Sequence, residues 1–178
     1  MFADITDYRV NSDWLFLTTA TVVVDYIAIL LTRYPQPNQI FKVGALNKWY
    51  DRFGIVAAIC DVGSLLIGLG AARYIYTLAG FTGAFMFLVC IVGFQLVHDI
   101  LFYLMIIRPA ARGQNQMIDV FKAYAAENGA NILAADAAML VSSAGVASAL
   151  KALPTHYTVS VAIVTMYAMT YSFYTKAA

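Results

Sequence analysis

Four aspartates stand inside long apolar stretches of this sequence, where burial of a carboxylate is most unfavourable. They are Asp25, Asp61, Asp99 and Asp136, and His98 directly precedes the third of them. An ionisable group within a membrane span is rare, and it commonly marks a proton relay or an ion path. Carboxylates accompanied by one histidine are suited to passing protons or holding cations, so this intramembrane polar layer is the candidate site.

The four aspartates belong to an order of residues that occurs twice. Each copy holds an acid, a base, a proline, a Lys-x-Tyr pair, a glycine and a second acid, and corresponding gaps differ by at most one residue. The first copy is Asp25, Arg33, Pro35, Lys48, Tyr50, Gly54 and Asp61, and the second is Asp99, Arg108, Pro109, Lys122, Tyr124, Gly129 and Asp136. This shared order predicts an internal tandem repeat, with unit 1 at about 14–73, unit 2 at about 81–150 and an extra helix at about 155–176.

The composition is typical of a membrane protein. Hydrophobic residues make up 62% of the 178 residues and charged residues 12%, whereas an average soluble domain has about 25% charged residues. Five apolar runs each approach the ~20 residues with which a helix crosses a bilayer. They lie at 14–32, 54–72, 81–107, 130–150 and 157–175. The sequence therefore predicts an all-α, polytopic membrane protein, with about five transmembrane helices in a single membrane domain over 1–178.

The basic residues predict the orientation of these spans, because the inner side of a membrane protein is the richer in Lys and Arg. With five crossings, one side holds Arg33, Lys42, Lys48, Arg52, Arg108, Arg112, Lys122 and Lys176, and the other holds Arg9, Arg73 and Lys151. We therefore expect the N-terminus outside, and the C-terminus and both long connections inside.

The two inner connections, 34–53 and 109–128, carry hydrophobic residues at helical spacing beside basic ones. This pattern predicts short amphipathic helices in the headgroup layer, with a solvated loop as the alternative. Each repeat unit is then a span, a surface helix and a span, and the two units are related by a pseudo-two-fold axis along the membrane normal. The residues expected at the membrane interface are Arg33, Lys48, Tyr50, Arg108, Lys122 and Tyr124.

Small residues gather in the second span of each unit, among them Gly68 and Gly70 in one and Ala138 and Gly145 in the other. Small residues let helix backbones approach closely. We therefore expect these two helices at the centre of the bundle. Their small-residue faces can be satisfied within one chain or between copies of it, so the oligomeric state stays open.

At 1.5 Å per residue, the four aspartates lie at one depth, ~10–14 Å from the inner boundary. No lysine or arginine lies at that depth, so the four acids cannot all stay ionised in hydrocarbon. The favoured interpretation is that protonated acids hydrogen-bond between helices, in a non-enzymatic protein with a structural role. One alternative is a small channel or transporter that conducts protons or cations through a hydrated cavity. The other is that the spans are shifted and the acids lie less deep.

The sequence lacks the residue patterns of several other classes of function. Neighbouring helix positions point about 100° apart, so we do not expect His98 and Asp99 to pair with each other. A single histidine gives little support for a metal site, and no hydrolase, phosphate-binding or dinucleotide-binding motif occurs. A net charge of +1 argues against nucleic-acid binding. We expect no catalytic residue, metal or cofactor, and we expect Cys60 and Cys90 to be buried free thiols.

One run of motifs in the second unit carries a family resemblance. It consists of His98-Asp99, Arg108-Pro109, the stretch 117–124, Glu127-Asn-Gly129 and Ala134-Ala-Asp136. Over roughly residues 95–175 the chain resembles short multi-pass membrane proteins of unassigned activity from large DNA viruses of algae and protists. The resemblance implies an internal-membrane or minor capsid-associated protein of a virion, with the lipid bilayer and other membrane or capsid proteins as partners. It implies no catalytic residues.

Overall fold

The computed structural model describes residues 4–34 and 41–175, and every regular element within them is helical. The elements are α1 (Asp13–Arg33), α2 (Gly44–Phe53), α3 (Ile55–Leu78), α4 (Ala84–Phe102), a π-helical turn η1 (Tyr103–Ile107), α5 (Gln116–Asn128), α6 (Asn131–Lys151) and α7 (Thr155–Phe173). The predicted all-α class is confirmed for these residues. Pro35 of the repeated order and Lys176 of the charge comparison lie outside them.

Four helices are long and apolar enough to cross a membrane: α1, α3, α4 continued by η1, and α6. They correspond to the first four predicted spans, although α3 continues to Leu78, beyond the predicted end at 72. A helix is also present where the fifth span was predicted, and α7 has 19 residues. It is not among the four, because Thr, Ser and Tyr recur along it. The four apolar helices are compatible with a multi-pass, membrane-embedded protein.

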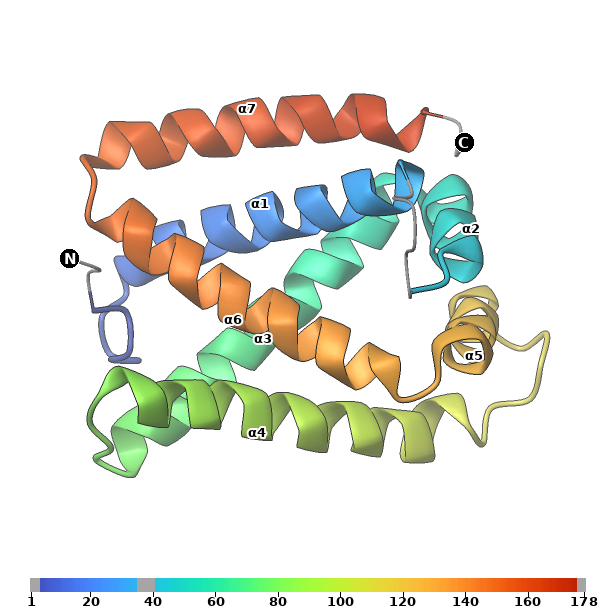
Figure 1. The fold of residues 1–178 in the computed structure, drawn as a ribbon, viewed down its shortest axis with the longest axis horizontal. Coiled ribbons are helices and arrows are strands. Elements are labelled where there is room, and N and C mark those ends of the chain that lie inside the picture. The colour runs from blue at the N-terminus through green and yellow to red at the C-terminus, as the bar shows by residue number, and fades with distance from the viewer. Residues whose placement is uncertain (1–3, 35–40, 176–178) are drawn as a thin grey trace.

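The long helices run back and forth between two ends of the molecule, and both short helices lie at the same end (Figure 1). α7 and α4 form opposite edges, α1 lies next to α7, and α3 and α6 cross between α1 and α4 (Figure 1). α1 packs against α3 and α6, α4 packs against the same two helices, and α2 packs on α5. If α1, α2 and α3 correspond to α4, α5 and α6, the α1–α3 contact matches the α4–α6 contact, and the α1–α6 contact matches the α3–α4 contact. α7 stands outside this pattern and packs on α1 and α6.

The most buried of the long helices is α1. Half of its most apolar 18-residue stretch lies inside the protein, compared with 22% for α6. α3 and α6, the two small-residue helices expected at the centre, each pack against both α1 and α4, while α1 is more buried than either because α7 covers one of its faces. The small residues allow a close approach at a crossing point: a Cβ on Gly68 of α3 would lie 3.1 Å from the Leu140 side chain of α6.

Two side chains at the end of α5 bind the start of α2. Glu127 accepts a hydrogen bond from the Ala45 amide in the first turn of α2, at 2.8 Å. A carboxylate at this position satisfies a free N–H and is favoured by the helix dipole. The Asn128 amide accepts from the Lys42 N–H and donates to the Lys42 carbonyl, at 2.8 and 2.9 Å. The two short helices are thereby held together as one layer across the end of the bundle.

The chain leaves each short helix through a glycine with an unusual backbone. Gly54 ends α2 at φ 49° and ψ −125°, and Gly129 ends α5 at φ 54° and ψ −134°. Residues with a side chain rarely adopt such angles. The two glycines of the repeated order thus make the same turn into α3 and α6.

The opposite end of the bundle holds a compensated charge cluster. The Arg73 guanidinium lies 3.1 Å from Oδ2 of Asp13, and both side chains are almost fully buried. Lys151 binds the other oxygen of Asp13 at 2.6 Å. Arg73 also donates to the carbonyl oxygens of Asp7 and Val10 in the N-terminal arm. This cluster joins α1, α3 and α6 and fixes the arm across their ends.

Replacing Asp13 by alanine should lower the free energy of unfolding by about 3 kcal/mol or more, because it leaves the Arg73 cation buried without its carboxylate. Chemical unfolding of the purified protein in detergent, followed by circular dichroism, measures the change. Asp7→Ala is the matched control, since Asp7 pairs with the exposed Arg9 side chain, and such surface pairs add little stability. Equal effects of the two substitutions would contradict the assignment.

Candidate functional site

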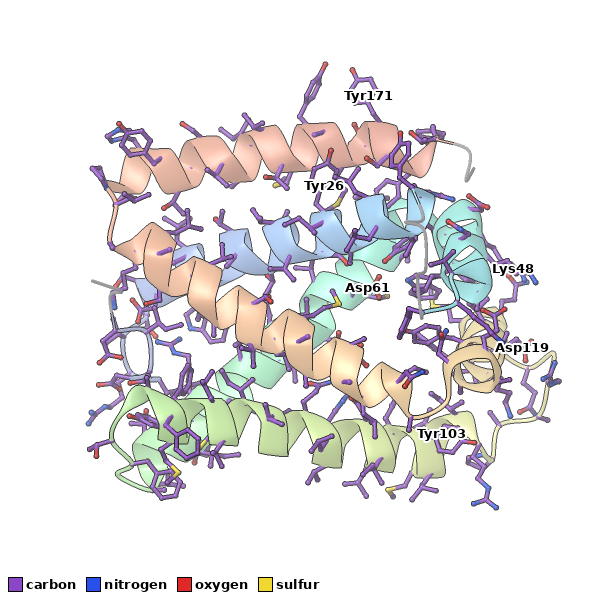
Figure 2. The ribbon with its side chains drawn as sticks, viewed as in Figure 1. Tyr26, Lys48, Asp61, Tyr103, Asp119 and Tyr171 are labelled. Carbon is purple, nitrogen blue, oxygen red and sulfur yellow. The ribbon has the colours of Figure 1, made fainter. Side chains whose placement is uncertain are left out.

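A cavity of about 1030 Å³ lies between the long helices, next to α2 and α5. Its walls come from α1, α3, α4 and α6, and the two short helices contribute the wall at their end of the bundle. All members of the predicted polar layer line it: Asp25, Asp61, His98, Asp99 and Asp136. Figure 2 shows Asp61 among the long helices in the interior. Within the described residues, the lining contains no lysine and no arginine.

Asp25 of α1 is the most isolated of the four acids. Its side chain has no exposed surface, and neither carboxyl oxygen has a hydrogen-bond partner among the described residues. An acid in this situation cannot stay charged unless a cation or a proton neutralises it. Asp25 is therefore a carboxyl group at the cavity wall that needs a proton or a cation to neutralise it.

Asp61 of α3 is held by a residue that the sequence analysis did not single out. The indole N–H of Trp49 in α2 donates to Oδ2 of Asp61 at 3.0 Å. Trp49 is itself 2% exposed, and its ring packs against those of Phe53 and Phe121 in tilted arrangements. The sequence does offer a signal for Trp49. It is the middle residue of the Lys-x-Tyr pair in the first copy, and that pair accompanies the acids in both copies.

Asp99 of α4 has two partners on its own helix. The Gln95 amide donates to Oδ1 at 2.7 Å, a contact expected for residues four apart on a helix. Nδ1 of His98 lies 3.1 Å from the same oxygen, so the prediction that these neighbours do not pair is wrong. The His98 ring is stacked between Phe94 and Phe102, and this orientation brings its Nδ1 edge to the short aspartate side chain.

Two tyrosines of the short helices reach the acids. Burial raises the pKa of Tyr50 well above its usual value, and the Asp61 carboxylate raises it further. Burial also raises the pKa of Tyr124, with Asp136 as the leading charge. A carboxylate disfavours a phenolate only at short range. Each short helix thus places the tyrosine of its Lys-x-Tyr pair beside the second acid of its own copy.

The expected interface residues divide into two groups. Lys48 and Arg108 are exposed, and Figure 2 shows Lys48 at the outer edge of the α2 end. Lys122 donates to the Arg108 carbonyl at 3.2 Å, which ties α5 to the end of η1. Tyr50, by contrast, is 4% exposed, and both it and Tyr124 line the cavity. These two tyrosines face inward because α2 and α5 pack their apolar sides against the bundle.

Arg33 also departs from its expected interface position. Its side chain is fully buried, and Nη1 lies 2.7 Å from Oδ1 of Asp51. It further donates to Asn47 Oδ1 at 3.1 Å and to the Phe173 carbonyl at 3.3 Å. The physical reason is that α2 folds back over the end of α1, so the basic residue that closes the span is covered instead of hydrated.

The arrangement offers carboxyl groups, one imidazole and two phenols around a shared space. Within the described residues, no three His, Cys, Asp or Glu side chains converge in the manner that a metal ion requires. Charge neutralisation by a proton or by a cation without strict coordination is the chemistry that these groups support. No protein-family model, curated protein or solved structure matches the chain.

Cys60 provides a probe of the cavity. It is an exposed free thiol, whereas Cys90 is a buried one, so the prediction that both are buried is wrong for Cys60. Cys60 lines the cavity beside Asp61. We expect N-ethylmaleimide to modify Cys60 in the folded protein in detergent, and Cys90 only after unfolding. Mass spectrometry of the labelled peptides reads the sites, Cys60→Ala should abolish native labelling, and equal rates at both thiols would contradict the placement.

The raised pKa values of Tyr50 and Tyr124 predict a loss of stability in alkali. An unfolded tyrosine ionises near pH 10, whereas the folded protein keeps these two phenols neutral to higher pH. The free energy of unfolding should therefore fall as pH rises above about 10. In the double variant Tyr50→Phe, Tyr124→Phe this fall should be shallower. Chemical unfolding of the wild-type protein and the double variant at a series of alkaline pH values measures the two slopes.

Proposed function

We propose that this chain is an integral membrane protein that binds positive charge in the acid-lined cavity, as the core of a small proton- or cation-conducting protein. The observation that carries the proposal is Asp25, whose two carboxyl oxygens are buried without a partner at the cavity wall. Three further carboxyl groups line the same space, and among the described residues the lining has no lysine or arginine. An intramembrane acid of this kind commonly serves transport.

The protein spans the membrane five times, with the N-terminus outside and the C-terminus inside, and arose by duplication of one helix–surface helix–helix unit. The paired helix contacts support the duplication, as do the matching turns at Gly54 and Gly129. The fifth crossing is supported by α7, which runs alongside α1 (Figure 1) and at about 1.5 Å per residue is long enough to cross the hydrocarbon.

A purely structural role is the second candidate, and the Trp49–Asp61 hydrogen bond favours it. In this role the acids are neutral and join helices, and the chain scaffolds a membrane such as the internal membrane of a virion. The two candidates differ in what the carboxyl groups must do. Joining helices requires a hydrogen-bonding group, which asparagine also supplies, whereas holding positive charge requires an ionisable one.

Purified protein reconstituted into liposomes distinguishes the two. With a pH-sensitive dye inside and a potassium gradient across the bilayer, we expect proton or cation flux above that of empty liposomes. Asp25→Asn should reduce the flux strongly, and the fourfold variant of Asp25, Asp61, Asp99 and Asp136 to asparagine should abolish it. The reason is that an amide can accept hydrogen bonds but cannot exchange a proton or balance a cation.

Asp119→Asn is the matched control, because Asp119 lies on α5 and binds the Gly113 amide outside the cavity. It should leave the flux unchanged. Absence of flux from the wild-type protein, with the asparagine variants folded and as stable as wild type, would overturn the conduction proposal and leave the structural role.

A further inference from the structure

The acid-lined cavity is larger than a proton path or a bare metal ion needs. Its volume of about 1030 Å³ is at the upper end of the roughly 300–1,000 Å³ that small-molecule sites occupy. Most of its lining is aliphatic or aromatic, with the acids as a few polar points. Sites of this composition bind ligands that have an apolar body and a small number of polar groups.

We propose that the cavity binds an organic ammonium ion with an apolar body, a lipophilic amine, whose positive charge is balanced by Asp25 at the cavity wall. This inference rests on the proposed binding of positive charge, and it names the class of the ligand. An ammonium group supplies the charge that the unpartnered Asp25 lacks. An apolar body would contact the aliphatic and aromatic walls of the cavity, whereas a hydrated inorganic cation would leave these walls in contact with water.

The aromatic side chains of the lining strengthen the assignment. Trp49, Tyr50, Phe121 and Tyr124 line the same cavity as the acids. Trp49 and Phe121 lie 4.9 Å apart between ring centroids, tilted by 41°. Faces of aromatic rings attract ammonium ions, and the attraction is strongest when the cation is desolvated. Acids and aromatic rings around one space are therefore complementary to an alkylated or aromatic amine.

The position of the opening also fits an apolar molecule. Leu31 of α1, Ile100 of α4 and Leu104 of η1 line the cavity, and each is close to half exposed. These residues lie on the flanks of membrane-spanning helices, so the cavity reaches the surface where lipid is expected. A lipophilic amine partitions into that layer and can enter the cavity from the side, whereas an inorganic cation must enter from water.

A set of three probes tests the charge and the body of the ligand separately. They are (4-phenylbutyl)trimethylammonium, its uncharged isostere with carbon in place of nitrogen, and tetramethylammonium, which has the charge without the body. Binding to wild-type protein in lipid nanodiscs is measured by isothermal titration calorimetry, with empty nanodiscs as the blank. We expect saturable binding of the first probe, and binding weaker by about 30-fold or more for the other two.

Protection of Cys60 places the bound probe. Because Cys60 lines the cavity, the first probe should slow its modification by N-ethylmaleimide, and the uncharged isostere should not. Asp25→Asn should weaken binding of the charged probe by about 30-fold, and Asp119→Asn should not change it. Comparison of the three probes on the wild-type protein needs no variant, so a failure of Asp25→Asn to fold leaves the proposal testable.

The outcomes separate the lipophilic-amine assignment from the proposed function. Equal binding of the charged probe and its isostere, or no binding of either, overturns the lipophilic-amine assignment. If Asp-dependent flux in liposomes persists in that case, the proposed function stands with a proton or an inorganic cation as its only ligand. Binding of tetramethylammonium as tight as that of the first probe also overturns the assignment, because the apolar body then contributes nothing.

Discussion

The structure depends on how four carboxyl groups are kept in an apolar interior where the described residues place no lysine or arginine beside them. Burial of a charged carboxylate without a partner is strongly unfavourable, and Asp25 has no partner in the described residues. The packing of α1 against α3, α6 and α7 must compensate for this cost. Any proton or cation that binds the folded protein in preference to the unfolded chain adds to its stability, so occupancy of the cavity and stability of the bundle are linked.

The two ends of the bundle treat buried charge in opposite ways. At one end, Asp13 is met by Arg73 and Lys151 within salt-bridge distance. At the other, Arg33 is paired with Asp51 and donates to Asn47, while the nearby cavity has no lysine or arginine beside its acids among the described residues. The fold therefore supplies full counter-charges for other buried ions, whereas the described residues place only the His98 imidazole beside one of the four aspartates. This contrast supports a binding role for the cavity more than a role as helix-joining contacts.

Much of this arrangement could be predicted from the sequence, because it follows from periodicity and spacing. Apolar runs gave four helices able to span a membrane, and equal spacing of the acids from the span ends anticipated a shared location for them. The inward orientation of Tyr50 and the covering of Arg33 could not be predicted, since both depend on how α2 folds onto the bundle. The His98–Asp99 contact was missed because helix geometry fixes the direction of the Cα–Cβ bond, whereas the side-chain rotamer determines where the terminal atoms lie.

The π-helical turn after α4 has a consequence for the comparison of the two halves. It is closed by the Arg108 N–H and the Tyr103 carbonyl at 2.8 Å, and a turn of this kind contains one residue more than an α-helical turn. The second copy has nine residues from acid to arginine, where the first has eight. The bulge absorbs this extra residue, so the helix on either side keeps its angular phase. The helix can therefore gain or lose one residue at this turn without changing its packing on either side. We expect single-residue insertions or deletions here in related chains.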